Sequence, residues 1–139
     1  MTNVQVTKSI KVPAKDAWSK LAAFGGIEEF SPIERSVLEG EGEGAKRTCY
    51  LPDGAAINEI LSKLDHENMH LEYKILSGPF PITDYTSDIR IQSTMDGNCE
   101  INWSCNFNTD PAKEPDMKNL FTGFYNTIID SLEAIINKN

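Results

Sequence analysis

The chain has 139 residues, of which 40% are hydrophobic and 24% charged, and its formal net charge is -8. This length and composition are typical of one folded domain and exclude an intrinsically disordered chain. The negative charge disfavours nucleic acids and anionic lipid surfaces as partners, because both would be repelled. We therefore expect a single domain over residues 1–139 with no nucleic-acid partner.

Three further features concern the cellular compartment. No apolar run approaches the roughly 20 residues that span a bilayer, so we expect no membrane insertion. The N-terminal stretch MTNVQVTKSIKV alternates in polarity and lacks the apolar core of a secretory signal. Cys49, Cys99 and Cys105 are an odd number of cysteines, which favours free thiols. The sequence therefore predicts a cytoplasmic protein.

In chain order, the pattern predicts a strand over 3–12, a helix within PAKDAWSKLAAFGG and a second short helix at GIEEF. Six segments of alternating polarity follow, at 34–39, 45–51, 55–64, 69–76, 84–94 and 99–108. The joints between them are short and contain turn-forming residues. Consecutive strands should therefore pair as antiparallel hairpins.

The clearest predicted element is a long C-terminal helix from Asp116 to Ile136. Its apolar positions recur at helical spacing, and they are Met117, Leu120, Phe121, Phe124, Tyr125, Ile128, Ile129, Leu132, Ile135 and Ile136. A stripe of this length needs one continuous partner surface, and the concave face of the antiparallel sheet is the only candidate. We predict an α+β domain.

The strand residues that alternation turns toward this helix are not uniformly apolar. One inward row contains Tyr85 and Ser87, another contains Tyr73, and the facing of Glu59 is ambiguous. Burying such groups without partners costs about 1–3 kcal/mol each. Two interpretations stay open at this point. Either a partly solvated cavity holds these polar groups, or Glu59 faces outward and the tyrosine hydroxyls reach the rim of a packed core.

The order of elements and two runs of sequence resemble the START-like (SRPBCC), helix-grip superfamily, and within it the bacterial polyketide cyclase/dehydrase-like branch. The runs are VPAKDAWSKLAAFGGIEEFSPIERSVLEGEGEGAKRT and ILSGPFPITDYTSDIRI. More distantly, they are similar to plant abscisic-acid receptors and pathogenesis-related class 10 proteins. The resemblance implies a seven-stranded antiparallel sheet wrapped around a long C-terminal helix, with two short helices after the first strand. It also implies a hydrophobic ligand cavity between sheet and helix.

The resemblance further implies which residues line that cavity. Two loops would form its mouth, one with Leu51 and Pro52 and the other with Phe80, Pro81 and Ile82. The remaining implied positions are Phe30, Pro32, Arg47, Glu59, Tyr73, Ile75, Tyr85, Ser87, Leu120, Phe124 and Ile128.

Two departures from the receptor pattern argue against hormone reception. Phe30 stands where the receptors have a lysine that meets a ligand carboxylate. Phe80 and Pro81 replace the histidine and arginine of the receptor latch. Because Pro79 and Pro81 restrict the backbone, we instead expect Phe80 to act as a lid of limited travel over the cavity.

The preferred functional hypothesis is a module that binds or carries a small hydrophobic molecule. The first alternative is a cyclase/dehydrase-type enzyme with Glu59 as general base and Tyr85 or Arg47 stabilising an oxyanion. The second is a protein-interaction module, and a homodimer also stays open. We expect no cofactor.

We expect no metal site either. His66 and His70 flank a DHEN hairpin turn, so their side chains should point outward into solvent rather than bind a metal.

Overall fold

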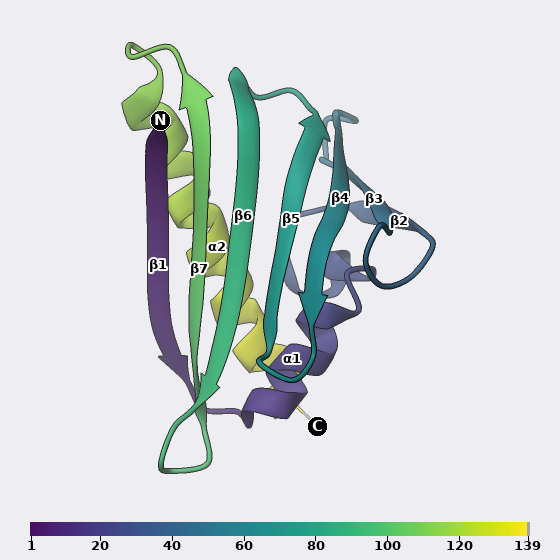
Figure 1. The fold of residues 1–139 in the computed structure, drawn as a ribbon, viewed down its shortest axis with the longest axis vertical. Helices are drawn as coiled ribbons and strands as arrows, with labels where there is room; N and C mark the ends of the chain where they lie inside the picture. The colour runs from purple at the N-terminus through teal and green to yellow at the C-terminus, as the bar shows by residue number, and fades with distance from the viewer. Residues whose placement is uncertain (139) are drawn as a thin grey trace.

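Seven strands form one antiparallel sheet in a computed structural model that describes residues 1–138 (Figure 1). The strands are β1 (Thr2–Ile10), β2 (Arg35–Glu39), β3 (Lys46–Tyr50), β4 (Ala56–Asp65), β5 (His70–Ser77), β6 (Ile82–Ser93) and β7 (Cys99–Thr109). Their spatial order is β1-β7-β6-β5-β4-β3-β2, so β2 to β7 follow one another as hairpins, as the short joints predict. The predicted α+β helix-grip fold is confirmed.

The first strand pairs with the last, so segments that are far apart in the sequence lie side by side in the sheet. The β1–β7 register runs without a break from Thr2 opposite Phe107 to Ile10 opposite Cys99. The strand ends earlier than predicted because the amide of Lys11 donates to the Glu133 side chain, at 2.6 Å, instead of to a neighbouring strand.

Two helices follow β1 and close one end of the sheet. Helix α1 spans Ala14–Ala22, and the 3-10 helix η1 spans Ile27–Phe30. Between them, Phe24 (φ 64°) and Gly26 (φ 73°) adopt left-handed backbone conformations. This conformation is unfavourable for a residue with a side chain. The turn points the Phe24 ring and carbonyl into the interior, where both contact Arg47.

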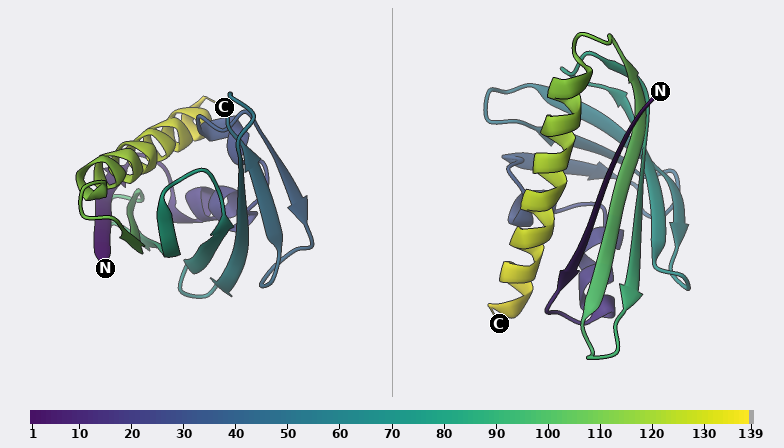
Figure 2. Two further views of the ribbon diagram at one scale, coloured as in Figure 1. Left: turned by 90° about the horizontal axis from the view of Figure 1, so that it is seen from above. Right: turned by 90° about the vertical axis from the view of Figure 1, so that its left-hand side faces the viewer.

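The long helix α2 (Glu114–Asn137) lies across the concave side of the sheet (Figure 2). Its stripe provides the buried residues Phe121, Tyr125, Ile128, Ile129 and Leu132. The Tyr125 ring stacks on the Trp103 indole of β7, with centroids 4.9 Å apart. The stripe therefore packs on the sheet as predicted. No helix within residues 1–138 is long and apolar enough to cross a membrane.

The β4–β5 hairpin corrects one prediction. His70 does not point into solvent: it is 4% exposed, and its Nε2 lies 2.7 Å from Asp88 Oδ1 on β6. His66 is exposed, but its Nδ1 accepts a hydrogen bond from the Trp18 indole of α1 at 3.0 Å. The sequence pattern misses both contacts because each partner comes from a distant segment. Beside this pair, the Arg90 guanidinium lies 3.6 Å from Asp88 and provides positive charge.

Candidate functional site

A cavity of about 130 Å³ lies between the concave face of the sheet and the N-terminal half of α2. Strands β4, β5 and β6 contribute one wall, α2 contributes the other, and the loops before β4 and β6 reach the rim. The lining residues are Leu51, Ile57, Glu59, Tyr73, Ile75, Phe80, Tyr85, Leu120, Phe121, Phe124 and Tyr125.

The lining changes in polarity with depth. The partly exposed residues, which form the mouth, are all apolar, and they are Leu51, Ile75, Phe80, Leu120 and Phe124. Every lining residue that carries a polar side-chain group is buried, namely Glu59, Tyr73, Tyr85 and Tyr125. The cavity therefore has an apolar mouth and a floor with fixed polar groups, which is the usual pattern of a small-molecule site.

The three tyrosine hydroxyls of the floor form a chain. Tyr85 is in the middle, in hydrogen-bond contact with Tyr125 on one side and 3.5 Å from the Tyr73 hydroxyl on the other. Burial raises the pKa of Tyr73 to about 12, and burial also places the pKa values of Tyr85 and Tyr125 well above the usual value. All three are thus neutral hydrogen-bonding groups at physiological pH.

Glu59 belongs to a buried ion pair. It lies directly opposite Arg47 in the β3–β4 ladder, and Arg47 Nε donates to Glu59 Oε1 at 2.6 Å. Arg47 and Glu59 are only 5% and 6% exposed. Cys49 Sγ also contacts Oε1, at 3.4 Å, and burial followed by the charge of Glu59 raises the pKa of this thiol to about 12. Glu59 is therefore a partnered carboxylate in the floor of the cavity.

The guanidinium of Arg47 is fully engaged by the protein. Its Nη1 donates to the Phe24 carbonyl at 2.9 Å, and its carbon lies 3.9 Å from the Phe24 ring centroid and 5.4 Å from that of Tyr73. Burial alone would lower the pKa of Arg47, but the opposing charge of Glu59 raises it above the usual value. Arg47 thus satisfies its charge within the protein.

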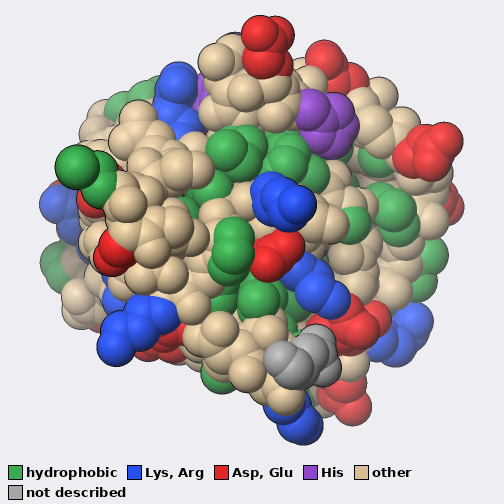
Figure 3. All heavy atoms as spheres, turned by 90° about the horizontal axis from the view of Figure 1, so that it is seen from below, with side chains coloured by type: hydrophobic (Ala, Val, Ile, Leu, Met, Phe, Trp, Pro, Cys, Tyr) green, Lys and Arg blue, Asp and Glu red, His purple; other side chains and the backbone are tan. Residues whose placement is uncertain are grey.

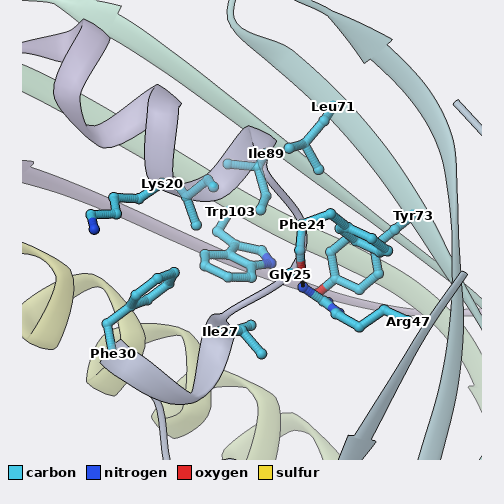
Figure 4. A pocket seen from close by; sticks show the side chains of 11 residues that line it. Lys20, Phe24, Gly25, Ile27, Phe30, Arg47, Leu71, Tyr73, Ile89 and Trp103 are labelled. Carbon is cyan, nitrogen blue, oxygen red and sulfur yellow. Dashed lines mark hydrogen bonds between the residues drawn. The ribbon is translucent and has the colours of Figure 1, made fainter. Parts of the chain in front are cut away.

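Arg47 and the Phe24 ring line a second, much smaller cavity but not the main one (Figure 4). The second cavity has a volume of about 10 Å³, which is enough for about one water molecule. Tyr73 lines both spaces.

Toward the end of the molecule closed by α1, apolar side chains gather in a patch that charged groups surround and partly cover (Figure 3). The interior is therefore open at the loop end and nearly filled at the α1 end.

Many of the residues implied by the family resemblance line the main cavity. They are Leu51, Glu59, Tyr73, Ile75, Phe80, Tyr85, Leu120 and Phe124. The sequence analysis did not predict Ile57, Phe121 and Tyr125 as lining residues. A signal for them was present, since Ile57 alternates with Glu59 on β4 and the other two lie on the apolar stripe of α2.

The other implied residues lie outside this cavity. Phe30 and Arg47 line the small cavity instead, and Pro32 and Pro52 are exposed in turns. Ile82 lines a groove on the other side of the β5–β6 loop.

Two of them are used by the core. Ser87 accepts a hydrogen bond from the Trp103 indole at 3.0 Å and donates to the Ser104 carbonyl at 2.9 Å. Ile128 is fully buried under α2. For Ser87 and Ile128, alternation and helical spacing predict the face correctly, but they do not predict that the side chain lies in the packed core rather than in the cavity lining.

The SGPFPITDY loop is held in place at several points. Thr109 Oγ1 donates to the Pro81 carbonyl at 2.7 Å, and Asn108 donates to Asp84 at 3.1 Å. The Phe80 ring packs edge-on against Phe121 on α2, with centroids 5.7 Å apart. β5 and β6 pair only as far as Lys74 opposite Thr86, so Phe80 lies beyond the paired ladder, between the cavity and the outer groove.

A curved seven-stranded antiparallel sheet that holds a C-terminal helix, with a cavity between them, defines a helix-grip protein. The profile of the family described as "Polyketide cyclase / dehydrase and lipid transport" matches residues 1–136. The chain belongs to this family, which confirms the resemblance seen in the sequence.

Solved structures agree with this assignment. The chain is similar to the protein XoxI from Bacillus cereus, at 26% identity and a TM-score of 0.88 over 97% of this chain and 95% of the other. It is also similar to an uncharacterized protein from Bacillus thuringiensis, at 24% identity and a TM-score of 0.86 over 96% and 98% of the two chains.

The plant enzyme norcoclaurine synthase from Thalictrum flavum shares the fold, at 16% identity and a TM-score of 0.81 over 99% and 94% of the two chains. That structure holds a transition state analogue. No protein of curated function matches this chain significantly.

Proposed function

We propose that the protein binds a small hydrophobic molecule in the main cavity and acts as a binding or carrier module. The observation that carries this proposal is the gradient of the cavity, from an apolar, partly exposed mouth to a buried floor with fixed polar groups. Burying the apolar surface of a ligand there would supply the affinity, at about 25 cal/mol per Å². The family description, which includes lipid transport, supports the same class of function.

The direct test is to close the mouth. Leu120 is 38% exposed and lines the cavity, so Leu120→Trp should fill the mouth without disturbing the core. Leu38 on β2 is also 38% exposed but is not a lining residue, which makes Leu38→Trp a matched control. Toluene titrations followed by amide NMR shifts should show binding by the wild type and the control and at least tenfold weaker binding by Leu120→Trp. Equal toluene affinity of the two variants would contradict this site.

An enzyme of the cyclase/dehydrase type is the second candidate, and the presence of the Glu59 carboxylate in the cavity lining favours it. The ion pair with Arg47 argues against Glu59 as a strong base, because it stabilises the charged carboxylate. The two candidates differ under Glu59→Gln. A catalytic role predicts loss of turnover with retained ligand affinity, whereas pure binding predicts that no new product mass appears with the wild type either.

We also propose that the chain is one domain over residues 1–139 and that it functions in the cytoplasm. The family match over 1–136 supports the first point. Three buried cysteines that form no disulfide support a reducing compartment. Cell fractionation would test the location, and recovery in a membrane or secreted fraction would contradict it.

A further inference from the structure

We infer the chemical class of the ligand: a neutral molecule with an apolar body of about one ring and a hydroxyl group, bound with the hydroxyl at the cavity floor. This inference rests on the proposed function and adds to it the size, charge and orientation of the bound molecule. Four features of the cavity carry it: its volume, the change from apolar to polar side chains between mouth and floor, the hydrogen-bonding groups of the floor, and the charged groups of the floor.

The volume limits the apolar body. An apolar cavity of about 150 Å³ in a protein core takes up one benzene molecule. The cavity here, at about 130 Å³, therefore matches one six-membered ring and is too small for a fused polycycle. Phe24 and Arg47 block expansion toward the α1 end of the interior.

The order of the lining fixes the orientation. A ligand meets Phe80, Leu120 and Phe124 first, and these side chains offer only apolar contacts. The polar groups are reached only at the buried end. A molecule with one polar group therefore binds with that group inward and its apolar body toward the mouth.

The floor has one hydrogen-bond donor and one acceptor to spare. Three tyrosine hydroxyls carry three protons, and the two contacts between them use two, so we assign the third proton, at the Tyr73 end of the chain, to a ligand acceptor. Both hydrogen bonds to the Glu59 carboxylate, from Arg47 and Cys49, use Oε1.

The second oxygen of Glu59, Oε2, accepts neither of these hydrogen bonds. Within residues 1–138, no fully buried side-chain oxygen or nitrogen lacks a partner, so Oε2 is not fully buried. Glu59 lines the cavity, so we assign this oxygen to the cavity space. A ligand hydroxyl can accept from a tyrosine and donate to Glu59 at the same time, whereas a ketone or an ether can only accept.

The charges of the floor exclude an anion. Glu59 is the only charged residue among the described lining residues, and the charge of Arg47 is already engaged by Glu59 and the Phe24 carbonyl. A carboxylate ligand would thus meet a negative group and no available cation. A cationic ligand gains little, because Arg47 already neutralises Glu59 at 2.6 Å.

Three probes that share one methyl-substituted benzene ring test the inference: p-cresol, toluene and 4-methylbenzoate, each titrated into the full chain and followed by amide NMR shifts. We expect p-cresol to bind about tenfold more tightly than toluene, because two hydrogen bonds form at the floor. We expect 4-methylbenzoate to bind at least tenfold more weakly than p-cresol.

Two variants locate the effect. Tyr73 is the end of the hydroxyl chain that lies beside Arg47, and we assign the spare proton to it. Tyr73→Phe moves the free proton to Tyr85, away from that position, so it should reduce the p-cresol preference to threefold or less while toluene binding stays unchanged. Tyr50→Phe is the matched control, since the Tyr50 ring lies against Arg35, away from the lining. It should leave all three affinities unchanged.

The outcomes separate this inference from the proposed function. Equal binding of toluene and p-cresol would overturn the inference and leave hydrophobic binding intact. Tighter binding of 4-methylbenzoate than p-cresol, or a full p-cresol preference in Tyr73→Phe, would also overturn it. If none of the probes shifts the lining residues, both the inference and the proposed cavity function fail.

Discussion

The two ends of the protein interior are built from the same sheet, yet only one of them is hollow. At the loop end, Leu120, Phe124 and Phe80 surround a cavity of about 130 Å³. At the α1 end, the Phe24 ring and the Arg47–Glu59 pair leave only about 10 Å³. The difference teaches that the curved sheet provides the space, while a few side chains decide how much of it remains open.

The filled end depends on an unusual backbone. Phe24 adopts a left-handed conformation at φ 64°, and its carbonyl and ring both contact the Arg47 guanidinium. The contacts with the buried Arg47 charge therefore help to hold Phe24 in this strained conformation. Breaking these contacts should have the largest effect on the difference between the two ends.

Arg47→Met should destabilise the protein most. It leaves the Glu59 carboxylate buried without its partner, which costs about 3–5 kcal/mol of unfolding free energy. Urea unfolding followed by circular dichroism measures this loss. Replacing both members, as Arg47→Met with Glu59→Leu, should recover most of it, since no charge then remains buried. A loss below about 1 kcal/mol in the single variant would show that the pair is not a structural divider.

Phe24→Ala should connect the two spaces. Removing a buried aromatic ring costs about 3–5 kcal/mol, and the space it leaves adjoins both Arg47 and Tyr73. We expect the wild type to exclude naphthalene and this variant to bind it. Phe30→Ala is the control, because Phe30 lines only the small cavity and should gain no naphthalene binding. A wild type that already binds naphthalene would contradict the size limit.

High pH should weaken the filled end through Cys49. Its pKa rises from 9.0 in the unfolded chain to about 12 in the folded protein, because of burial and then the charge of Glu59. A raised pKa means that the folded state holds the proton more tightly, so this stabilisation is complete below pH 9 and is lost as the pH rises toward 12.

Unfolding free energy measured from pH 8 to pH 11 should therefore fall more steeply for the wild type than for Cys49→Ala. Lysines and tyrosines titrate in both proteins, so the comparison isolates the thiol. Parallel curves for the two proteins would contradict a raised pKa of Cys49 in the folded state.

At the open end, a substitution of Phe80 should have the smallest effect on stability and a specific effect on the rate of ligand exchange. Phe80→Ser should speed ligand exchange severalfold, because Phe80 lies at the mouth and contacts Phe121, while stability falls by only about 1 kcal/mol. Leu76→Ser, at a residue 56% exposed on the neighbouring strand, is the control. NMR exchange measurements with toluene give the rate. The same rate in wild type and Phe80→Ser would remove the lid role.

The sequence predicts the fold well because its signals are periodic. The stripe of α2 and the alternation of β7 each repeat over many residues, so the architecture follows from local spacing. The family resemblance then predicts the cavity between sheet and helix. It also predicts that Glu59 lies on the face of the sheet that is turned toward this cavity. The structure has Glu59 on that face, since Glu59 is buried and lines the cavity.

The contents of the cavity could not be predicted in the same way. Whether Arg47 lines the open cavity depends on the left-handed turn at Phe24, and a pattern of polarity carries no information on such a turn. The burial of His70 depends on Asp88, a residue on another strand. Contacts between distant segments, rather than local periodicity, decide these positions.

Native mass spectrometry of the protein purified from its own organism tests the central claim most directly. We expect the wild type and Leu38→Trp to carry the mass of one small molecule and Leu120→Trp to appear bare, because only the last variant fills the mouth of the cavity. A bare wild type that also fails to take up toluene or p-cresol would contradict the proposal that this cavity binds a hydrophobic ligand.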